Sequence, residues 1–507
     1  MTLAKAAQRV AEEFEFTPDQ VRNGVKEFLA EMDDGLQKDG TFMNQIPTYV
    51  TAVPNGTEKG LYMAVDLGGT NFRVCSILLH GDTTFTLNSS KIKIPQTLMK
   101  AQTAKELFAF LAKQIEAFLK EHHGEHYECH IEKKQKGEQA SEEEIFNMGF
   151  TFSFPVRQVG INKGYLIRWT KGFDIADAIG KDVCGLLQAE IDALHLPVRV
   201  AALVNDTVGT LMARSYTSPG KTGTLLGAIF GTGTNGAYVE KLSKVTKLTN
   251  AEEKGLYDES TGEMIINTEW GSFDNGLKTL PNTKYDAALD KDTPNTGIQM
   301  FEKRISGMYL GEILRLAIVS LLDDPAVPLF SDENSGSNDF RTTTLVNKDS
   351  ALLKPWGIDT SFLSHTGGDS TPGLQITRQV LQRDLGVHGP SIEDAQAVHV
   401  IAAAVGKRAA RLSAIAVGAI VLQSKRLDVP ASDPPIDDDM VDIGVDGSLV
   451  EFYPGFEEYM REALGEIPGV GEKGEKRIRI GIAKDGSGVG AALIALVAGR
   501  ALDAVAR

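Results

Sequence analysis

A Gly-Thr-Asn tripeptide occurs twice in the chain, at residues 69–71 and again at 233–235. Each copy follows an apolar run, at 61–67 and at 224–230, and apolar residues resume after each copy. This order predicts a strand, a glycine-rich turn and a second strand in both places. Glycines let the backbone approach a ligand closely, and successive N–H groups in such a turn bind anionic oxygens. The repeat therefore predicts two related lobes that present two phosphate-binding turns to one ligand.

Other polar residues lie at the ends of predicted strands. Asp66 closes the first strand, where its carboxylate is suited to contact Mg²⁺ through water. Residues 446–448 (Asp-Gly-Ser) give a third strand–turn signal. Residues 485–488 (Asp-Gly-Ser-Gly) precede a helix, and helix N-termini attract phosphate. Any one of these turns is also explained as ordinary chain reversal, but their number favours a ligand site.

Asp206 follows an apolar strand and precedes a helix-like segment, within residues 203–207 (Leu-Val-Asn-Asp-Thr). An aspartate in this position either caps the helix or points a carboxylate into a cleft at the carboxyl end of the strand. The residues alone favour the cap.

The histidines of residues 122–130, beside Cys129, suggest a metal-site hypothesis. A transition-metal site needs a closed set of well-placed ligands. The polar surroundings of these histidines favour a solvated helix end instead.

The elements that must position these residues are predicted from periodicity and capping signals. Thr17, Pro18 and Gln20 form a capping-box signal for the second of two helices within residues 1–40. We also expect an amphipathic helix at 103–120, a solvated insertion at 129–145, a loop at 331–349, a connector at 430–439, strands at 441–445 and 478–482, and a final helix.

Composition bounds the class of protein. The 507 residues favour about three domains or two large lobes. A net charge of −16 disfavours a nucleic-acid partner. There is no apolar run of about 18 residues and no N-terminal targeting pattern, so we expect no membrane span. Cys75, Cys129 and Cys184 are few and far apart, which favours a reducing compartment, and we expect a cytoplasmic protein.

An ordered set of motifs resembles the hexokinase family from about residue 20 to the C-terminus. Residues 61–74 are similar to the family's first phosphate motif, and residues 151–155 with 169–173 are similar to its sugar-binding signature. The other matching runs, in the family's order, are 205–207, 231–235, 267–271 and 299–303. Each motif alone is weak, whereas the ordered set is specific.

The resemblance implies an α/β fold with two lobes of the actin-like ATPase and sugar-kinase (ribonuclease H-like) type, and a cleft between the lobes. The expected division is an N-terminal helical segment at 1–59, a small domain at 60–204 completed by 479–507, and a large domain at 205–478. Glucose is expected in the cleft, with ATP mainly on the large-lobe side.

The resemblance also implies roles for individual residues. It makes Asp206 the catalytic base for the sugar 6-hydroxyl and places Lys171 near the transferring phosphoryl group. The expected sugar contacts are Ser153, Thr170, Lys171, Asn205, Asp206, Asn235, Glu269 and Glu302. The expected ATP contacts are Asp66, Gly68, Gly69, Thr70, Asn71, Arg73, Lys91, Thr232, Thr360, Ser364, Gly447 and Ser448. Mg²⁺ would arrive with ATP rather than bind a metal site of the protein, and Asp66 would reach it through water.

The implied activity is ATP-dependent phosphorylation of glucose to glucose 6-phosphate, the first step of glycolysis. Similarity to fungal glucokinases at 162–165 and 302–308, and in the long stretches 250–262 and 280–295, favours glucose over fructose. Residues 295–298 (Asn-Thr-Gly-Ile) lack the proline that often precedes this glycine in the family, which predicts an altered loop.

Three alternatives stay open at this point. The first is a broad hexokinase that also uses fructose and mannose. The second is a hexokinase-like glucose sensor with little turnover, and the third is an actin- or chaperone-type ATPase. Asp206, Lys171 and the glycine turns are intact, which favours catalysis, and the sugar signature argues against the ATPase.

Overall fold

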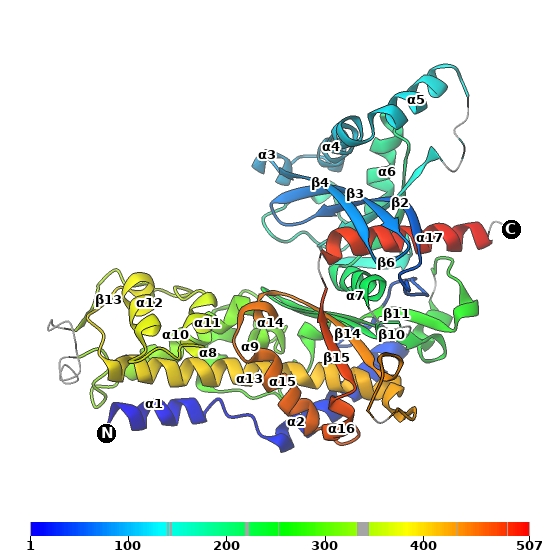
Figure 1. The fold of residues 1–507 in the computed structure, drawn as a ribbon. Coiled ribbons are helices and arrows are strands. Elements are labelled where there is room, and N and C mark those ends of the chain that lie inside the picture. Colours follow the sequence, from blue (N-terminus) through cyan, green and yellow to red (C-terminus); the bar gives the residue numbers. More distant parts are fainter. Residues whose placement is uncertain are drawn as a thin grey trace.

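The computed structural model describes residues 2–138, 141, 144–218, 223–251, 253–331, 344–432, 434–483 and 485–505. Two lobes, each built on a mixed β-sheet, lie one above the other in Figure 1. The chain begins in the lower lobe, builds the upper lobe, returns to the lower lobe and ends with a helix beside the upper sheet.

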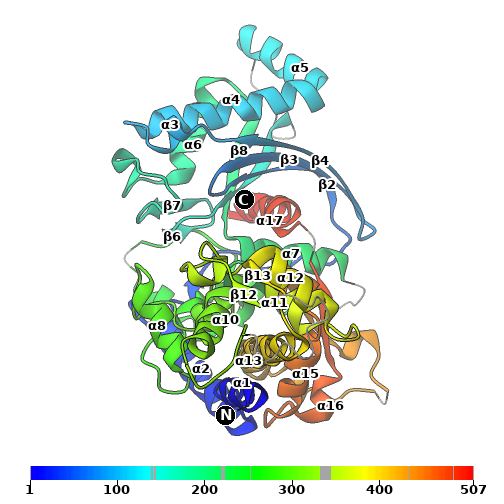
Figure 2. The ribbon, with the colours of Figure 1, turned by 90° about the vertical axis from the view of Figure 1, so that its left-hand side faces the viewer.

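The upper lobe, which is the small one, carries a five-stranded sheet in the order β4-β3-β2-β5-β8. Its strands are β2 (Lys59–Leu67), β3 (Asn71–His80), β4 (Phe85–Lys93), β5 (Phe146–Phe152) and β8 (Val198–Val204). The first three are antiparallel, and β5 and β8 continue the sheet parallel to β2. Helices α4 (Ala104–His122) and α6 (Val183–Ala193) cover one face, and α17 (Ala491–Val505) lies against the other (Figure 2).

The lower lobe, which is the large one, carries a six-stranded sheet in the order β1-β11-β10-β9-β14-β15. Its strands are β1 (Ile46–Pro47), β9 (Leu226–Phe230), β10 (Thr234–Lys241), β11 (Glu263–Asn267), β14 (Val441–Asp446) and β15 (Ile478–Ile482). Strands β1, β11, β10 and β9 pair antiparallel, and β14 and β15 extend the sheet parallel to β9.

The two sheets share one topology, three antiparallel strands followed by two parallel ones, with β1 as an extra edge strand in the large lobe. The two Gly-Thr-Asn tripeptides begin at equivalent turns, β2–β3 and β9–β10. The prediction of two related α/β lobes is therefore confirmed.

The long helix α13 (Ile392–Ser424) forms the spine of the large lobe, and it is buried on all sides over residues 408–421. Helices α1 (Leu3–Glu12), α2 (Pro18–Gln37) and α15 (Phe456–Gly465) pack along it. The predicted capping box of α2 is present, since the Thr17 hydroxyl accepts from the Gln20 N–H and the Gln20 side chain accepts from the Thr17 N–H.

The remaining elements complete the two lobes. The helices are α3 (Gln96–Met99), α5 (Gly124–Gln135), α7 (Asp206–Thr217), α8 (Lys284–Asp292), α9 (Glu302–Ile305), α10 (Gly307–Leu322), α11 (Ser361–Gly367), α12 (Gln375–Leu385), α14 (Ser448–Phe452) and α16 (Gly471–Glu475). The strands are β6 (Val156–Gly160), β7 (Lys163–Leu166), β12 (Leu345–Val346) and β13 (Val387–His388).

Helix α7 connects the two sheets. It follows β8 of the small sheet directly, packs on β9, β10 and β14 of the large sheet and contacts α17. Its N-terminus therefore lies between the lobes, so residues at the β8–α7 junction face both of them.

The predicted strands at 441–445 and 478–482 and the predicted helix at 103–120 are confirmed. Part of the predicted insertion is helix α5, and most of the predicted loop at 331–349 lies outside the described residues. The domain division stays a proposal. Because β15 pairs with β14 in the large sheet, we would begin the returning C-terminal segment after Ile482 rather than at 479. None of the helices in the described residues combines the length and the apolar character that crossing a membrane requires.

Candidate functional site

A cavity of about 450 Å³ lies between the lobes, where β5 and β8 end. Five of the predicted sugar contacts line it, namely Ser153, Lys171, Asn205, Asp206 and Glu269. These residues come from the end of β5, the loop after β7, the β8–α7 junction and the segment after β11. The fold therefore gathers residues that are far apart in the sequence into one small polar cavity.

Asp206 is the first residue of α7, directly after the β8–α7 junction residue Asn205. The N-cap of α7 is Asn205, whose side-chain oxygen accepts from the Thr207 N–H at 3.0 Å. The interpretation of Asp206 as the cap is therefore wrong, because the preceding residue already fills that position. The Asp206 carboxylate accepts from the same N–H at 2.9 Å and is exposed to the cavity.

Lys171 contacts both Ser153 and the glycine turn between β2 and β3. Its Nζ donates to the Ser153 carbonyl oxygen at 2.8 Å and lies 5.5 Å from the centre of the Phe154 ring. A β-carbon on Gly69 would lie 3.2 Å from the Lys171 Cδ atom, so the β2–β3 turn touches this side chain. Lys171 has a left-handed backbone (φ 58°), a strained conformation that is common at functional sites.

Two carboxylates on the large-lobe side are held in fixed orientations. The Oε1 atom of Glu269 accepts from Asn267 Nδ2 at 2.8 Å and from Asn235 Nδ2 at 3.3 Å. Glu302 accepts from the Thr234 N–H at 3.0 Å. Asn235 and Glu302 thus lie around Glu269 but do not themselves line the cavity. Thr170, the remaining predicted sugar contact, does not line it either.

The surroundings of the site raise the pKa of its acids. Desolvation by the surrounding protein is the largest cause of the raised pKa of Asp206, Glu269 and Glu302. Like charge adds to it, since Asp206 acts on Glu269 and Glu269 acts on Glu302. The Thr207 N–H and the Lys171 ammonium oppose the shift at Asp206. Several carboxylates with raised pKa values in one cleft are typical of a functional site.

Asp66, the next-to-last residue of β2, and Asp446, the last residue of β14, lie beside the same cleft. Desolvation raises the pKa of Asp66, which a hydrogen bond with the Ser487 side chain partly offsets and the nearby Asp206 charge increases. Burial also raises the pKa of Asp446, and its charge raises that of Asp206. Asp446 and Ser487 were predicted only as members of turns, and their closeness to Asp66 and Asp206 comes from the fold.

A second cavity of about 800 Å³ opens in the large lobe. Four of the predicted ATP contacts line it, namely Thr232, Thr360, Ser364 and Ser448. Gly447 lies at φ 116°, and a β-carbon there would come within 2.5 Å of the carbonyl group of Phe230. Only glycine lets the turn of residues 446–448 pack so closely against the turn that follows β9.

The remaining predicted ATP contacts lie on the small lobe, away from the lining of that cavity. In the β2–β3 turn, the Gly68 N–H donates to the Asn71 carbonyl oxygen at 3.1 Å and the Asn71 side chain donates to Thr70 at 3.0 Å. Arg73 donates to Asp485 at 2.6 Å, an ion pair that the sequence did not indicate. Lys91 faces Arg73 across the β3–β4 ladder and is exposed.

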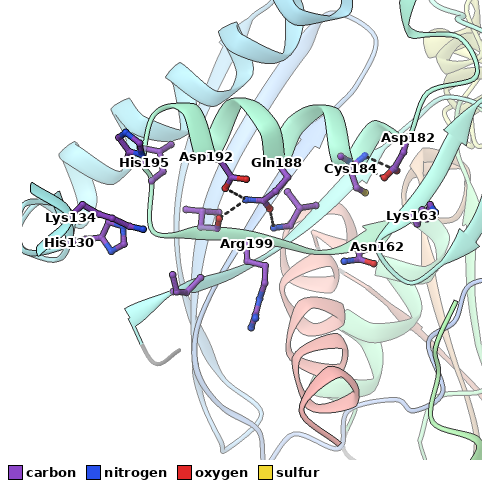
Figure 3. A pocket seen from close by; sticks show the side chains of 15 residues that line it. His130, Lys134, Asn162, Lys163, Asp182, Cys184, Gln188, Asp192, His195 and Arg199 are labelled. Atoms are coloured by element: carbon purple, nitrogen blue, oxygen red, sulfur yellow. Dashed lines mark hydrogen bonds between the residues drawn. The ribbon is translucent and has the colours of Figure 1, made fainter. Parts of the chain in front are cut away.

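A further cavity, of about 690 Å³, lies on the small lobe away from the cleft. Figure 3 shows His130 and Lys134 of α5 near His195 at one end, and Asp182, the N-cap of α6, with Cys184 of α6 at the other. None of the predicted sugar or ATP contacts lines this cavity.

The histidine-rich stretch supports no metal site. The rings of His122 and His123 pack near Phe118, and those of His123 and His126 pack near Phe146. Within the part of the chain that the structure describes, no group of three or more His, Cys, Asp or Glu side chains is arranged to hold a metal ion.

Nearly the whole chain is similar to known hexokinases and glucokinases. Two family models, each described as hexokinase, match residues 6–216 and 225–497. The chain is 59% identical to a glucokinase of Aspergillus niger, with 98% of each chain covered, and 40% identical to glucokinase-1 of Saccharomyces cerevisiae, with 97% of each covered. A structure of the Schistosoma mansoni hexokinase complexed with glucose matches with a TM-score of 0.73 and 32% identity, covering 97% of this chain and 98% of the other. A second hexokinase crystal structure matches with a TM-score of 0.78 and 27% identity, covering 98% and 99%.

Proposed function

The chain belongs to the hexokinase family, and on that basis we propose that its interlobe cleft transfers the γ-phosphoryl group of ATP to the 6-hydroxyl of glucose. The enzyme is a glucokinase or hexokinase that phosphorylates glucose. The observation that carries the proposed mechanism is the cavity in which Ser153, Lys171, Asn205, Asp206 and Glu269 meet.

The chemistry of this cavity suits a hexose. A hexose presents several hydroxyl groups that donate hydrogen bonds, and ionised carboxylates accept them with two oxygens each. Glu269 would accept two such bonds in an orientation fixed by Asn267 and Asn235. The other proposed sugar contacts are Ser153, Thr170, Lys171, Asn205, Asp206, Asn235 and Glu302.

Asp206 is the proposed general base. Its carboxylate is exposed to the cavity and needs no change in α7 to reach a substrate, since Asn205 supplies the cap. It would accept the proton of the 6-hydroxyl as that oxygen attacks the γ-phosphorus and ADP leaves. The raised pKa of Asp206 makes it a stronger base than an ordinary aspartate.

Lys171 is the proposed charge that stabilises the transferring phosphoryl group. Phosphoryl transfer needs mainly positioning and charge stabilisation. The methylene stem of Lys171 lies beside the Gly69 turn, and its positive charge acts on Asp206, so this residue lies between the predicted phosphate turn and the base.

ATP is the phosphoryl donor that the family uses, and we propose that it lies with its nucleoside in the large-lobe cavity beside Thr232, Thr360, Ser364 and Ser448. Its phosphates would extend toward residues 66–73. Arg73 is a less direct contact in this proposal, because Asp485 already binds it.

The acids of the cleft fit Mg²⁺ brought by ATP. Asp66 and Asp446 lie at the ends of their strands near Asp206, and the described residues hold no group of three or more ligands that would form a metal cage. Mg²⁺ keeps several waters and is commonly held by phosphates with one or two carboxylates. When bound, it would neutralise charge on the phosphates.

We further propose glucose as the preferred sugar and the cytoplasm as the compartment. Relatives named glucokinase are 59% and 40% identical, and hexokinase-1 of Saccharomyces cerevisiae is 38% identical. The three cysteines are free in the structure, which fits a reducing compartment.

The test is identification of the product. The protein is incubated with Mg-ATP and glucose, fructose or mannose, and the products are followed by phosphorus NMR. We expect a phosphate ester on O6 of glucose, formed faster than the esters of fructose and mannose. Equal rates would replace the glucokinase proposal with a broad hexokinase. Glucose binding without an ester would indicate a sensor and overturn the proposed catalysis.

A further inference from the structure

The β6–β7 hairpin joins the two parts of the proposed sugar site. β6 (Val156–Gly160) begins shortly after Ser153, and β7 (Lys163–Leu166) ends shortly before Thr170 and Lys171. The hydrogen bond from Lys171 Nζ to the Ser153 carbonyl oxygen, 2.8 Å long, ties the two ends together. The hairpin is thus an arm whose base lies in the cavity and whose tip points away from it.

Residues 253–257, which we name the clasp, reach this arm from the large lobe just before β11. The Gly255 N–H donates to the Val159 carbonyl oxygen at 2.6 Å. A β-carbon on Gly255 would lie 2.5 Å from the Gly160 Cα atom and 3.0 Å from the Val159 oxygen. Both of these atoms belong to the backbone, so any side chain at 255 must push the clasp and the arm apart.

Glu253 adds a second contact between the clasp and the arm. Its Oε1 atom accepts from Lys163 Nζ at 2.9 Å and from the Tyr165 hydroxyl at 3.2 Å. Lys163 and Glu253 are more than two-fifths exposed, so water screens this ion pair and it constrains the arm only weakly. The backbone contact of Gly255 is therefore the stronger constraint on the position of the arm.

The clasp is itself anchored in the large lobe. Tyr257 packs edge-on against Tyr49, with ring centres 5.9 Å apart and planes at 62°. Tyr49 follows β1, which pairs with β11 in the large sheet. Gln158 Nε2, also on β6, donates to the Thr48 carbonyl oxygen at 3.2 Å. The large lobe therefore contacts β6 at two points, through Gly255 and through Thr48.

We propose that the clasp positions the sugar-binding segment, with Gly255 and Glu253 as positioning residues for Ser153 and Lys171. The inference rests on the proposed function, because it assigns a role relative to the sugar. It gives the large lobe a direct contact with the small-lobe segment that carries Ser153 and Lys171, in addition to Glu269 across the cavity. Displacing the arm would misplace Ser153 and Lys171 together while leaving the large-lobe ATP cavity as it is.

The test compares Gly255→Ala with Gly124→Ala, in which the added β-carbon meets no atom within 4 Å. A displacement of catalytic groups by even 1 Å can lower the rate about 10²-fold. We therefore expect kcat/KM for glucose to fall about tenfold in Gly255→Ala, while KM for ATP changes less than about twofold. Glu253→Gln should lower kcat/KM for glucose about twofold to threefold, because it weakens an exposed pair. Thermal unfolding of Glu253→Gln should match that of Gly124→Ala, and Gly255→Ala should remain fully folded at the assay temperature.

An unchanged kcat/KM for glucose in Gly255→Ala would overturn the inference. Equal losses for glucose and ATP together with lower stability would also overturn it, because they indicate a merely structural role. If Gly255→Ala does not fold, Glu253→Gln decides, and wild-type kinetics would refute the clasp. If the wild type binds glucose without turnover, the proposed function fails, and the glucose dissociation constants of the same variants still test the clasp.

Discussion

Replacing Asp206 with asparagine should separate catalysis from stability. Asparagine keeps the shape of the side chain but is not a base at neutral pH. Loss of a general base costs about 10²–10⁴ in rate, which at 1.36 kcal/mol per factor of ten adds about 2.7–5.4 kcal/mol to the barrier. We expect kcat to fall by this factor in Asp206→Asn, while glucose still binds.

The structure predicts little change in the free energy of unfolding of Asp206→Asn. The N-cap is Asn205, and an asparagine oxygen at 206 would still accept from the Thr207 N–H. The lost charge near the helix N-terminus is worth about 0.3–1 kcal/mol. Against this, desolvation raises the pKa of Asp206, so ionising it at neutral pH costs stability that asparagine does not lose. The two effects oppose each other, and the net change should stay within about 1 kcal/mol.

The assay measures ADP release under saturating glucose and ATP, beside urea unfolding of both proteins. It also includes a pH profile, because a base must be ionised to act. The raised pKa of Asp206 places the acid limb of wild-type kcat/KM above the range of an ordinary aspartate, and Asp206→Asn should lose that limb. More than about a tenth of wild-type turnover in Asp206→Asn would refute the assignment of the base. A large loss of stability with retained turnover would restore the cap interpretation.

Three further predictions test packing and charge in the large lobe. Desolvation raises the pKa of Glu31 to about 7, so at pH values between about 4.5 and 7 the folded protein holds a proton that the unfolded chain releases. The free energy of unfolding therefore falls as the pH rises from about 4.5 to 7. Glu31→Gln should unfold at a higher urea concentration than wild type at pH 8 but not at pH 4.5. Arg408→Met leaves the buried Asp286 carboxylate without its bidentate partner at 2.7 Å and should cost about 3–5 kcal/mol of unfolding free energy in urea titrations, whereas a cost below about 1 kcal/mol would show that the pair is not needed. Gly447→Ala puts a β-carbon into the backbone after β9 and should raise KM for ATP about tenfold relative to Gly124→Ala, measured with glucose saturating; an unchanged KM would remove this turn from the ATP site.

Local signals in the sequence predicted much of the fold. The capping box at Thr17 marks the start of α2, and the strand at 478–482 has the predicted bounds. The two Gly-Thr-Asn turns predicted two related lobes, because turn chemistry and apolar runs are properties of neighbouring residues, and the shared strand order of the two sheets came from the structure. The edge strand β1 was not predicted, because a strand of two residues shows no alternation of apolar and polar residues and its position depends on pairing with β11.

The candidate site was predicted in parts but not in its connections. The residues alone made Asp206 a cap, and only the geometry of α7 shows that Asn205 holds that position. The ion pair between Arg73 and Asp485 joins residues 412 positions apart, so no sequence spacing indicates it. Asn267 orients Glu269 from two residues away, and its presence beside Glu269 in one motif was the only available signal.

The central claim is that this cleft uses ATP only to phosphorylate a sugar at its 6-hydroxyl. The most direct test is ADP release by the wild-type protein with Mg-ATP and glucose, 6-deoxyglucose or no sugar. A sugar without the 6-hydroxyl can fill the cavity but offers no acceptor to Asp206. We predict rapid ADP release with glucose and almost none in the other two reactions. ADP release that is equal in all three would contradict the account, because it would show that the cleft hydrolyses ATP without transferring phosphate to a sugar.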